Sequence, residues 1–169
     1  MASLVFSAGN YAMATTAAPA AVALTTAIRT LMQIASHASI GFEVVEWGIS
    51  FDGSAAATPG KVELVDTVAI PATSLTAYNA ADIVKVSQVG TRASTVQLGT
   101  ALSGWYTASA EGTIVATRNF DIQYLPPTAP YIKQFPLERG PTVLLAEFLR
   151  VRAHMSAAVN ALCYIVWAE

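Results

Sequence analysis

The chain has 169 residues, of which 54% are hydrophobic and 12% are charged, whereas an ordinary soluble domain carries about 25% charged residues. Its net charge of −2 lacks the dense basic face that nucleic-acid binding requires, and no apolar run reaches the roughly 20 residues that span a bilayer. Nucleic acid and membrane are therefore both excluded as expected partners. This length suits one domain, and a domain of this size cannot hide so much apolar surface within itself, so we expect a subunit of an assembly.

The first 21 residues carry no charge and consist mostly of Ala, Ser, Thr and other small residues. Such residues make poor strands and poor core, so we expect residues 1–21 to form an extended N-terminal arm that packs on a neighbour or stays mobile. Leu4, Phe6 and Tyr11 are the large side chains that would anchor the arm as interface residues. Its deletion is expected to weaken binding without unfolding the domain.

The remaining residues, 22–169, are expected to form a single β-sandwich domain. Residues 22–35 alternate as a strand does, although their apolar residues also fit one face of a helix; the threonines and β-branched residues favour the strand. Residues 42–51 give the clearest strand pattern, with Val45 and Trp47 on the same face. Asp52 follows as a turn residue, and residues 61–67 form a shorter strand.

Residues 68–110 show the least regular pattern and carry only three charged side chains within many Ala, Ser and Thr. A long structureless run inside a compact domain is unusual, so we expect a loop-rich excursion that serves as a contact surface and has short strands of its own. Trp105 and Tyr106 lie in this segment and are candidate interface residues, because aromatic side chains are enriched where proteins bind one another.

The last third of the chain returns to strand patterns. Residues 125–130 contain three prolines and are expected to be a rigid crossing segment or a loop. Residues 147–153 place Arg150 and Arg152 on one face of a strand, where they would be either solvated or paired with carboxylates of an adjacent strand or of another subunit. Residues 159–167 are apolar on both faces, which predicts a closing strand that is buried on both sides.

The short strands number about seven or eight, and no regular strand–helix alternation is visible. This pattern predicts an all-β fold, a β-sandwich with a jelly-roll topology as the preferred connection. Trp47 and Trp167 are expected in its core, and Cys163 is expected to be a small buried hydrophobic residue.

Catalytic, cofactor-binding and metal-binding residues are not expected. His37 and His154 have no second ligand at a metal-site spacing, and no phosphate-binding glycine loop or nucleophile elbow is present. Glu43 and Glu46 would point to opposite sides of their strand and could not act as an acid–base pair. The sequence therefore does not predict an enzyme.

Four segments carry a family resemblance: 44–54 (VVEWGISFDGS), 118–121 (RNFD), 148–152 (FLRVR) and 159–165 (VNALCYI). They resemble small virion structural proteins of tailed bacteriophages, especially phages of actinobacterial hosts, whose members are usually called minor capsid or head decoration proteins. The resemblance extends over most of the chain from about residue 25 and brings no catalytic residues.

The resemblance implies a β-rich capsid decoration (cement) protein, often a homotrimer, bound to the major capsid protein on the outer shell. It would be made in the host cytoplasm and would reside in the virion. Two alternatives stay open: another virion subunit, such as a tail-tube, head–tail or fibre-base protein, and a lectin-like adhesion module that would use Trp105 and Tyr106.

Overall fold

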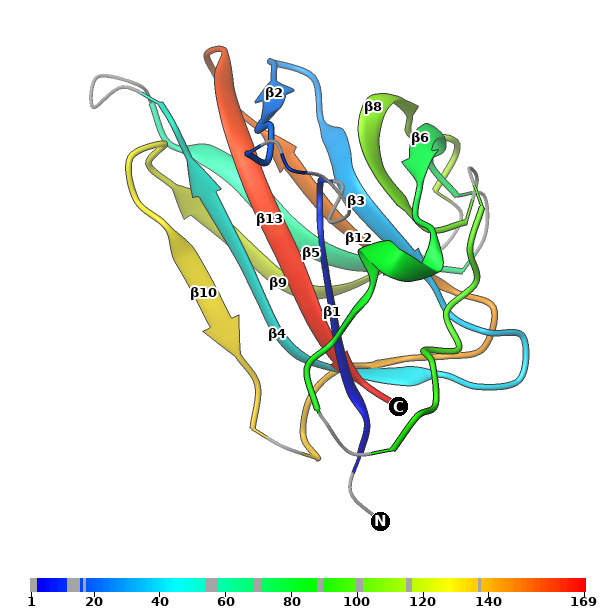
Figure 1. The fold of residues 1–169 in the computed structure, drawn as a ribbon. Coiled ribbons are helices and arrows are strands. Elements are labelled where there is room, and N and C mark those ends of the chain that lie inside the picture. The colour runs from blue at the N-terminus through cyan, green and yellow to red at the C-terminus, as the bar shows by residue number, and fades with distance from the viewer. Residues whose placement is uncertain are drawn as a thin grey trace.

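Thirteen strand segments form two antiparallel sheets that pack face to face (Figure 1). The computed structural model describes residues 3–11, 16, 18–53, 58–68, 71–87, 90–99, 102–114, 117–136 and 138–169. Sheet A contains β1 (Val5–Gly9), β2 (Val22–Leu24), β4 (Phe42–Phe51), β7 (Val84–Lys85), β10 (Tyr131–Gln134), β11 (Thr142–Val143) and β13 (Val159–Ala168). Sheet B contains β3 (Arg29–Ala35), β5 (Gly60–Thr67), β6 (Thr73–Ala77), β8 (Gly104–Ala110), β9 (Thr117–Leu125) and β12 (Phe148–His154).

Sheet A has the strand order β10-β4-β13-β1-β7, with β11 beside β4 and β2 beside β13; it faces the viewer in Figure 1. Sheet B lies behind it with the order β6-β8-β3-β12-β5-β9. The described residues form one 3₁₀ turn, η1 (Ala80–Asp82), and no α-helix, so none of them could cross a membrane as a helix. The predicted all-β sandwich is confirmed, whereas the expected seven or eight strands undercount it because several edge segments have only two to five residues.

The hydrophobic core fills the space between the sheets. Trp47 and Trp167 have no exposed surface, which confirms their predicted place in the core. Cys163 is 2% exposed and its side chain lies in the same core. In the closing strand β13, buried core positions alternate with half-buried ones, so only one of its two apolar faces is fully covered by this chain.

A β-bulge corrects the face that we predicted for the first half of β4. Val166 of β13 pairs with Glu46 and Trp167 pairs with Val44, which leaves Val45 as the extra residue. The bulge changes the alternation, so Val44 and Trp47 both point into the core, each 0% exposed. Glu43 and Glu46 consequently lie on the outer side of sheet A, not on opposite sides of the strand.

The N-terminal segment contains a strand of the chain's own sheet. β1 pairs along its whole length with β13, from Val5 opposite Ala168 to Gly9 opposite Tyr164. The expectation of an arm that packs on a neighbour is therefore corrected for Val5–Gly9. Two large residues followed by three small ones suffice for a strand here because the partner β13 pairs with it along its whole length. Residues 12–15 and 17 of the expected arm lie outside the described residues.

The expected excursion over 68–110 supplies edge strands to both sheets. β6 and β8 extend sheet B beyond β3, and β7 extends sheet A beyond β1. Figure 1 shows β8 and β6 curling away from the rest of sheet B. η1 lies between β6 and β7 in the chain. It is fixed by a capping box in which the side chains of Asn79 and Asp82 each accept a hydrogen bond from the backbone N–H of the other residue.

Candidate interaction surfaces

Arg150 and Arg152 point to the outer face of sheet B, yet Arg150 is 0% exposed and Arg152 is 9% exposed. The guanidinium Nη1 of Arg150 donates to the backbone oxygen of Glu111 at 3.0 Å and lies 3.8 Å from its carboxylate. Nε of Arg152 lies 3.3 Å from Glu63 and 3.6 Å from Glu111. The interpretation of a solvated face is wrong, and the expected pairing with a carboxylate on an adjacent strand is confirmed for Arg152, because Glu63 lies opposite it on β5.

Glu111 explains how two arginines can be covered on the outside of a sheet. This residue follows β8 directly, and its carboxylate accepts hydrogen bonds from both the backbone N–H and the hydroxyl of Thr30, the latter at 2.7 Å. Its carboxylate thus lies over the middle of sheet B between the two guanidinium groups. Burial lowers the pKa of Arg150 to about 10, which still leaves it charged at neutral pH.

A second cluster of charges lies on the other face of sheet B, since Asp66 is paired with the core residue Leu149. Arg118 contacts the Asp66 carboxylate and lies 2.7 Å from Glu147. Asp66 is 1% exposed, and this burial, together with the neighbouring Glu147, raises its pKa to about 7 despite Arg118. The sequence gives no signal for these pairs because the partners lie 29 to 52 residues apart.

These two clusters leave the molecular surface even poorer in charge than the composition suggests. The chain has nine Lys and Arg and eleven Asp and Glu. Seven of these residues are buried: Glu63, Asp66, Asp82, Asp121, Glu147, Arg150 and Arg152. A surface with few charges lacks the repulsion and hydration that keep proteins apart.

The three expected anchors of the N-terminal segment have different positions. Phe6 is 2% exposed and stacks on Trp167 with ring centroids 6.1 Å apart, so it belongs to the core and offers no surface to a partner. Leu4 is half-buried against the same core. Tyr11 is half-buried on the outer face of sheet A, where its ring covers Gly9 so closely that a Cβ there would lie 2.5 Å from it.

Tyr11 also lines a shallow apolar groove of about 300 Å³ on sheet A. The other groove residues include Tyr164 and Leu162 from β13 and Ile132 from β10. Tyr164 covers Gly48 and donates its hydroxyl to Glu46 at 2.6 Å, and burial raises its pKa to about 12. The groove is the uncovered apolar side of the closing strand.

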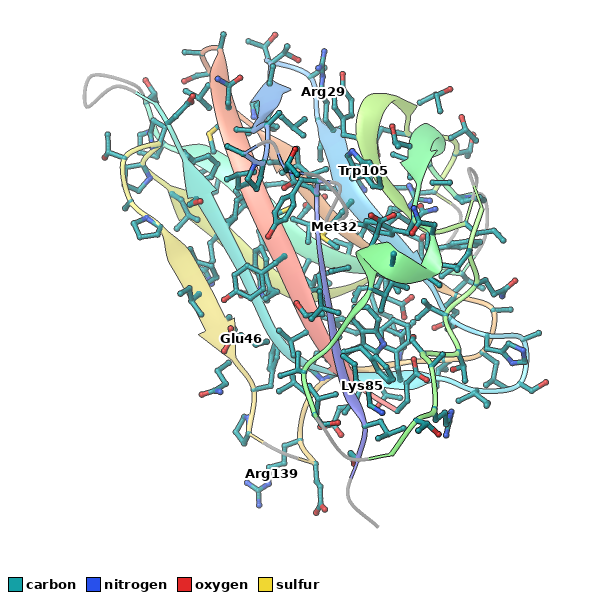
Figure 2. All side chains as sticks on the ribbon, in the orientation of Figure 1. Arg29, Met32, Glu46, Lys85, Trp105 and Arg139 are labelled. Carbon is teal, nitrogen blue, oxygen red and sulfur yellow. The ribbon has the colours of Figure 1, made fainter. Side chains whose placement is uncertain are left out.

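Trp105 and Tyr106 lie at the start of β8, near the end of the sheet where Figure 2 places Arg29 and Trp105. Both are half-buried. Trp105 packs on Tyr78 with ring centroids 5.2 Å apart, and the Arg29 guanidinium lies 5.0 Å from the centre of the Tyr106 ring, with a hydrogen bond to its hydroxyl. The two rings are thus engaged by their own chain.

The most exposed apolar side chains lie at positions that the sequence did not single out. Tyr124 of β9 is 73% exposed and Ile132 of β10 is 62% exposed; Leu144 and Leu145, in the loop before β12, are each 52% exposed. Two neighbouring loops form what we call the end patch, namely Ile40, Leu144 and Leu145. Their backbones touch, since a Cβ on Gly41 would lie 3.6 Å from Cα of Leu144.

A cluster of metal-binding side chains is not found among the described residues. No group of three or more His, Cys, Asp or Glu residues lies close enough together to hold a metal ion there. Asp52 is expected to bond within its own turn, but its carboxylate accepts from the backbone N–H and side-chain amide of Asn160 on β13, both at 2.7 Å. These hydrogen bonds lower the pKa of Asp52.

Comparisons with family models, with curated proteins and with solved structures find no match to this chain.

Proposed function

We propose that this chain is a structural subunit of a tailed-phage virion that binds the outside of the capsid shell and stabilises contacts between major capsid subunits. The observation that carries the proposal is the composition of the surface: seven charged residues are buried, whereas large apolar side chains are exposed. Such a surface suits an assembly, in which apolar contacts are covered by neighbours. The resemblance of residues 44–54 and three later segments supports the same role.

The rigidity of the fold also supports this role. Both ends of the described chain are fixed in the centre of sheet A, where β1 pairs with β13. A subunit that is ordered before it binds loses little conformational entropy on binding. A jelly-roll topology, which is common in viral capsid domains, remains part of this proposal, as does a location on the virion surface after synthesis in the host cytoplasm. The homotrimer that the resemblance implies stays a prediction.

The end patch is the part of the surface that we propose contacts the shell. Ile40, Leu144 and Leu145 are three exposed large apolar side chains from two touching loops, and covering such side chains is the gain that an apolar contact with the shell would supply. The adhesion alternative is weaker, because Trp105 and Tyr106 are already held by Tyr78 and Arg29 of their own chain.

Co-sedimentation with undecorated shells of a tailed-phage major capsid protein tests the proposal. The wild-type protein should sediment with the shells, and the variant Leu144→Glu/Leu145→Glu should lose at least tenfold in apparent affinity. Val86→Glu is the matched control, because Val86 is 53% exposed on a different part of the surface and should bind as the wild type does. Wild-type protein that stays in the supernatant would rule out capsid binding.

A further inference from the structure

The edge strand β9 has an open side. β9 has nine residues and pairs with β5 along one edge, and no described strand pairs with its other edge. Proteins protect such an edge with proline, lysine or a bulge, because its free N–H and C=O groups can otherwise bind a further strand. The open edge of β9 therefore needs an explanation.

The edge is protected in its first half and unprotected in its second. The pairing with β5 shifts between Leu64 and Val65, which leaves Phe120 as an extra, bulged residue. After the bulge, residues 121–125 (DIQYL) form a regular strand that contains no lysine or proline. Ile122 is 42% exposed and Tyr124 is 73% exposed on its outer face. This regular half can accept another strand.

The sequence of this half is complementary to itself in one antiparallel register. In an antiparallel pair, residues directly opposite each other point to the same face of the sheet. A two-fold axis perpendicular to the sheet that relates two copies of β9 must therefore place one residue opposite its own copy. When Gln123 lies opposite its own copy, Ile122 of each chain lies opposite Tyr124 of the other chain. All five residues 121–125 then have a partner. Pairs of an aromatic and a β-branched residue stabilise antiparallel sheets.

The neighbouring registers are worse. Centring the axis on Asp121 would place two carboxylates opposite each other, which is destabilising. Centring it on Ile122 would draw the bulged Phe120 into the ladder. On the adjacent strand β5, Lys61 and Glu63 flank Tyr124 and Ile122 and form an ion pair with each other at 2.8 Å, so they do not set like charges against a second copy.

We propose that β9 pairs with β9 of a second copy of this chain, antiparallel and centred on Gln123, so that the two copies share one continuous sheet. The inference rests on the geometry of the edge and does not depend on capsid binding. It makes the free protein a two-fold dimer, a state that differs from the trimer implied by the resemblance.

Sedimentation equilibrium of the purified chain tests the association. The wild type should have twice the mass of one chain at micromolar concentration, and Ile122→Lys should weaken the dimer at least tenfold. Leu145→Lys is the matched control, since Leu145 is also an exposed apolar residue but lies in the end patch; it should remain dimeric. A monomeric or trimeric wild type, or dissociation by Leu145→Lys as well, would overturn the proposal.

Disulfide cross-linking tests the register. Residues directly opposite in an antiparallel pair have Cβ atoms about 4.5–5.5 Å apart, close enough for a disulfide to form with little movement. Under oxidation, Gln123→Cys should give a covalent dimer. Asn119→Cys, which is exposed on the same strand but distant from the axis, should not. The native Cys163 is buried and should stay unreactive. Equal cross-linking of both variants, or of neither, would contradict the register.

Discussion

Arg150 has no exposed surface, although the chain has few charges and could have placed each of them in water. It lies with Arg152 between the carboxylates of Glu63 and Glu111, and Thr30 holds Glu111 in place. Burying a guanidinium requires that its charge be compensated, because the low dielectric of the interior makes an uncompensated charge costly. Each member of this cluster therefore depends on the others, and removing one carboxylate should be expensive.

Glu111→Gln should lower the free energy of unfolding by about 2–3 kcal/mol, somewhat less than the roughly 3–5 kcal/mol typical of a fully buried pair, because the Glu111 side chain is 21% exposed. Urea unfolding followed by tryptophan fluorescence would measure the change. Glu138→Gln, at an exposed position, is the control and should change the stability by less than about 0.5 kcal/mol. Equal effects of both substitutions would show that the cluster is not buried in solution.

Asp66 should make the stability depend on pH. Its pKa is about 7 in the folded protein and about 3.9 in an unfolded chain, so the folded state holds an extra proton between these values. The contribution of Asp66 is therefore fully present below about pH 4 and is lost as the pH rises through about 7.

The measurement is the unfolding free energy of the wild type minus that of Asp66→Asn, taken at intervals from about pH 4 to about pH 8. This difference should fall as the pH rises, because Asn cannot titrate while the other groups are common to both proteins. A difference that stays constant would mean that the carboxyl group of Asp66 is ionised throughout this range.

At the scale of elements, β1 shows why the N-terminal segment is part of the domain. Phe6 lies against Trp167, the last aromatic residue of β13, and Tyr78 donates its hydroxyl to the backbone oxygen of Gly9. The strand thus joins the closing strand to the segment that carries η1. Deletion of residues 1–21 should consequently destabilise the fold, in contrast to our expectation from the sequence.

Phe6→Ala tests this in a single position. The substitution removes a 2% exposed ring and should lower the free energy of unfolding by about 3–5 kcal/mol. Ala20→Ser, at an exposed position of the same N-terminal segment, should have little effect, and thermal unfolding by circular dichroism would compare the two. A Phe6→Ala protein as stable as the wild type would restore the interpretation of a detachable arm.

The strands with strong alternation could be predicted from the sequence, and the core positions of Trp47 and Trp167 followed from it. The bulge at Val45 could not be predicted. In a bulge two residues of one strand lie opposite a single residue of the partner, and a search for strict alternation does not detect this. β1 has only five residues, three of them small, and its stability comes from a partner more than 150 positions away. The pairing of Arg150 with Glu111 likewise depends on a loop that a pattern analysis cannot place.

At the scale of the whole molecule, Asp121 links the two sheets where both have an edge strand. It comes from β9 of sheet B, and one of its oxygens accepts hydrogen bonds from Trp47 Nε1 at 3.2 Å and from the Tyr131 hydroxyl at 2.7 Å, both in sheet A. The ring of Tyr131 also packs edge-on against Trp47. This contact closes the sandwich on the side of β9 and β10.

Asp121→Ala should lower the unfolding free energy by about 1–3 kcal/mol, because the buried indole N–H of Trp47 loses its acceptor. Tyr131→Phe removes only one donor from the same carboxylate and should cost about 1 kcal/mol. Chemical unfolding of both variants gives the comparison. If Tyr131→Phe were as costly as Asp121→Ala, the carboxylate would not be the link between the sheets.

The pairing of β1 with β13 brings residues from the two ends of the sequence into contact: the backbone N–H of Glu169 donates to Leu4 at 2.9 Å, and that of Leu4 donates to Glu169 at 3.2 Å. A short peptide bridge could therefore join the two ends while new ends are opened in the exposed turn at residues 156–158. In such a circular permutant β13 and β1 would become a hairpin, and the order of every sheet would be preserved. Cargo fused to either native end would project from the same tip of the sandwich.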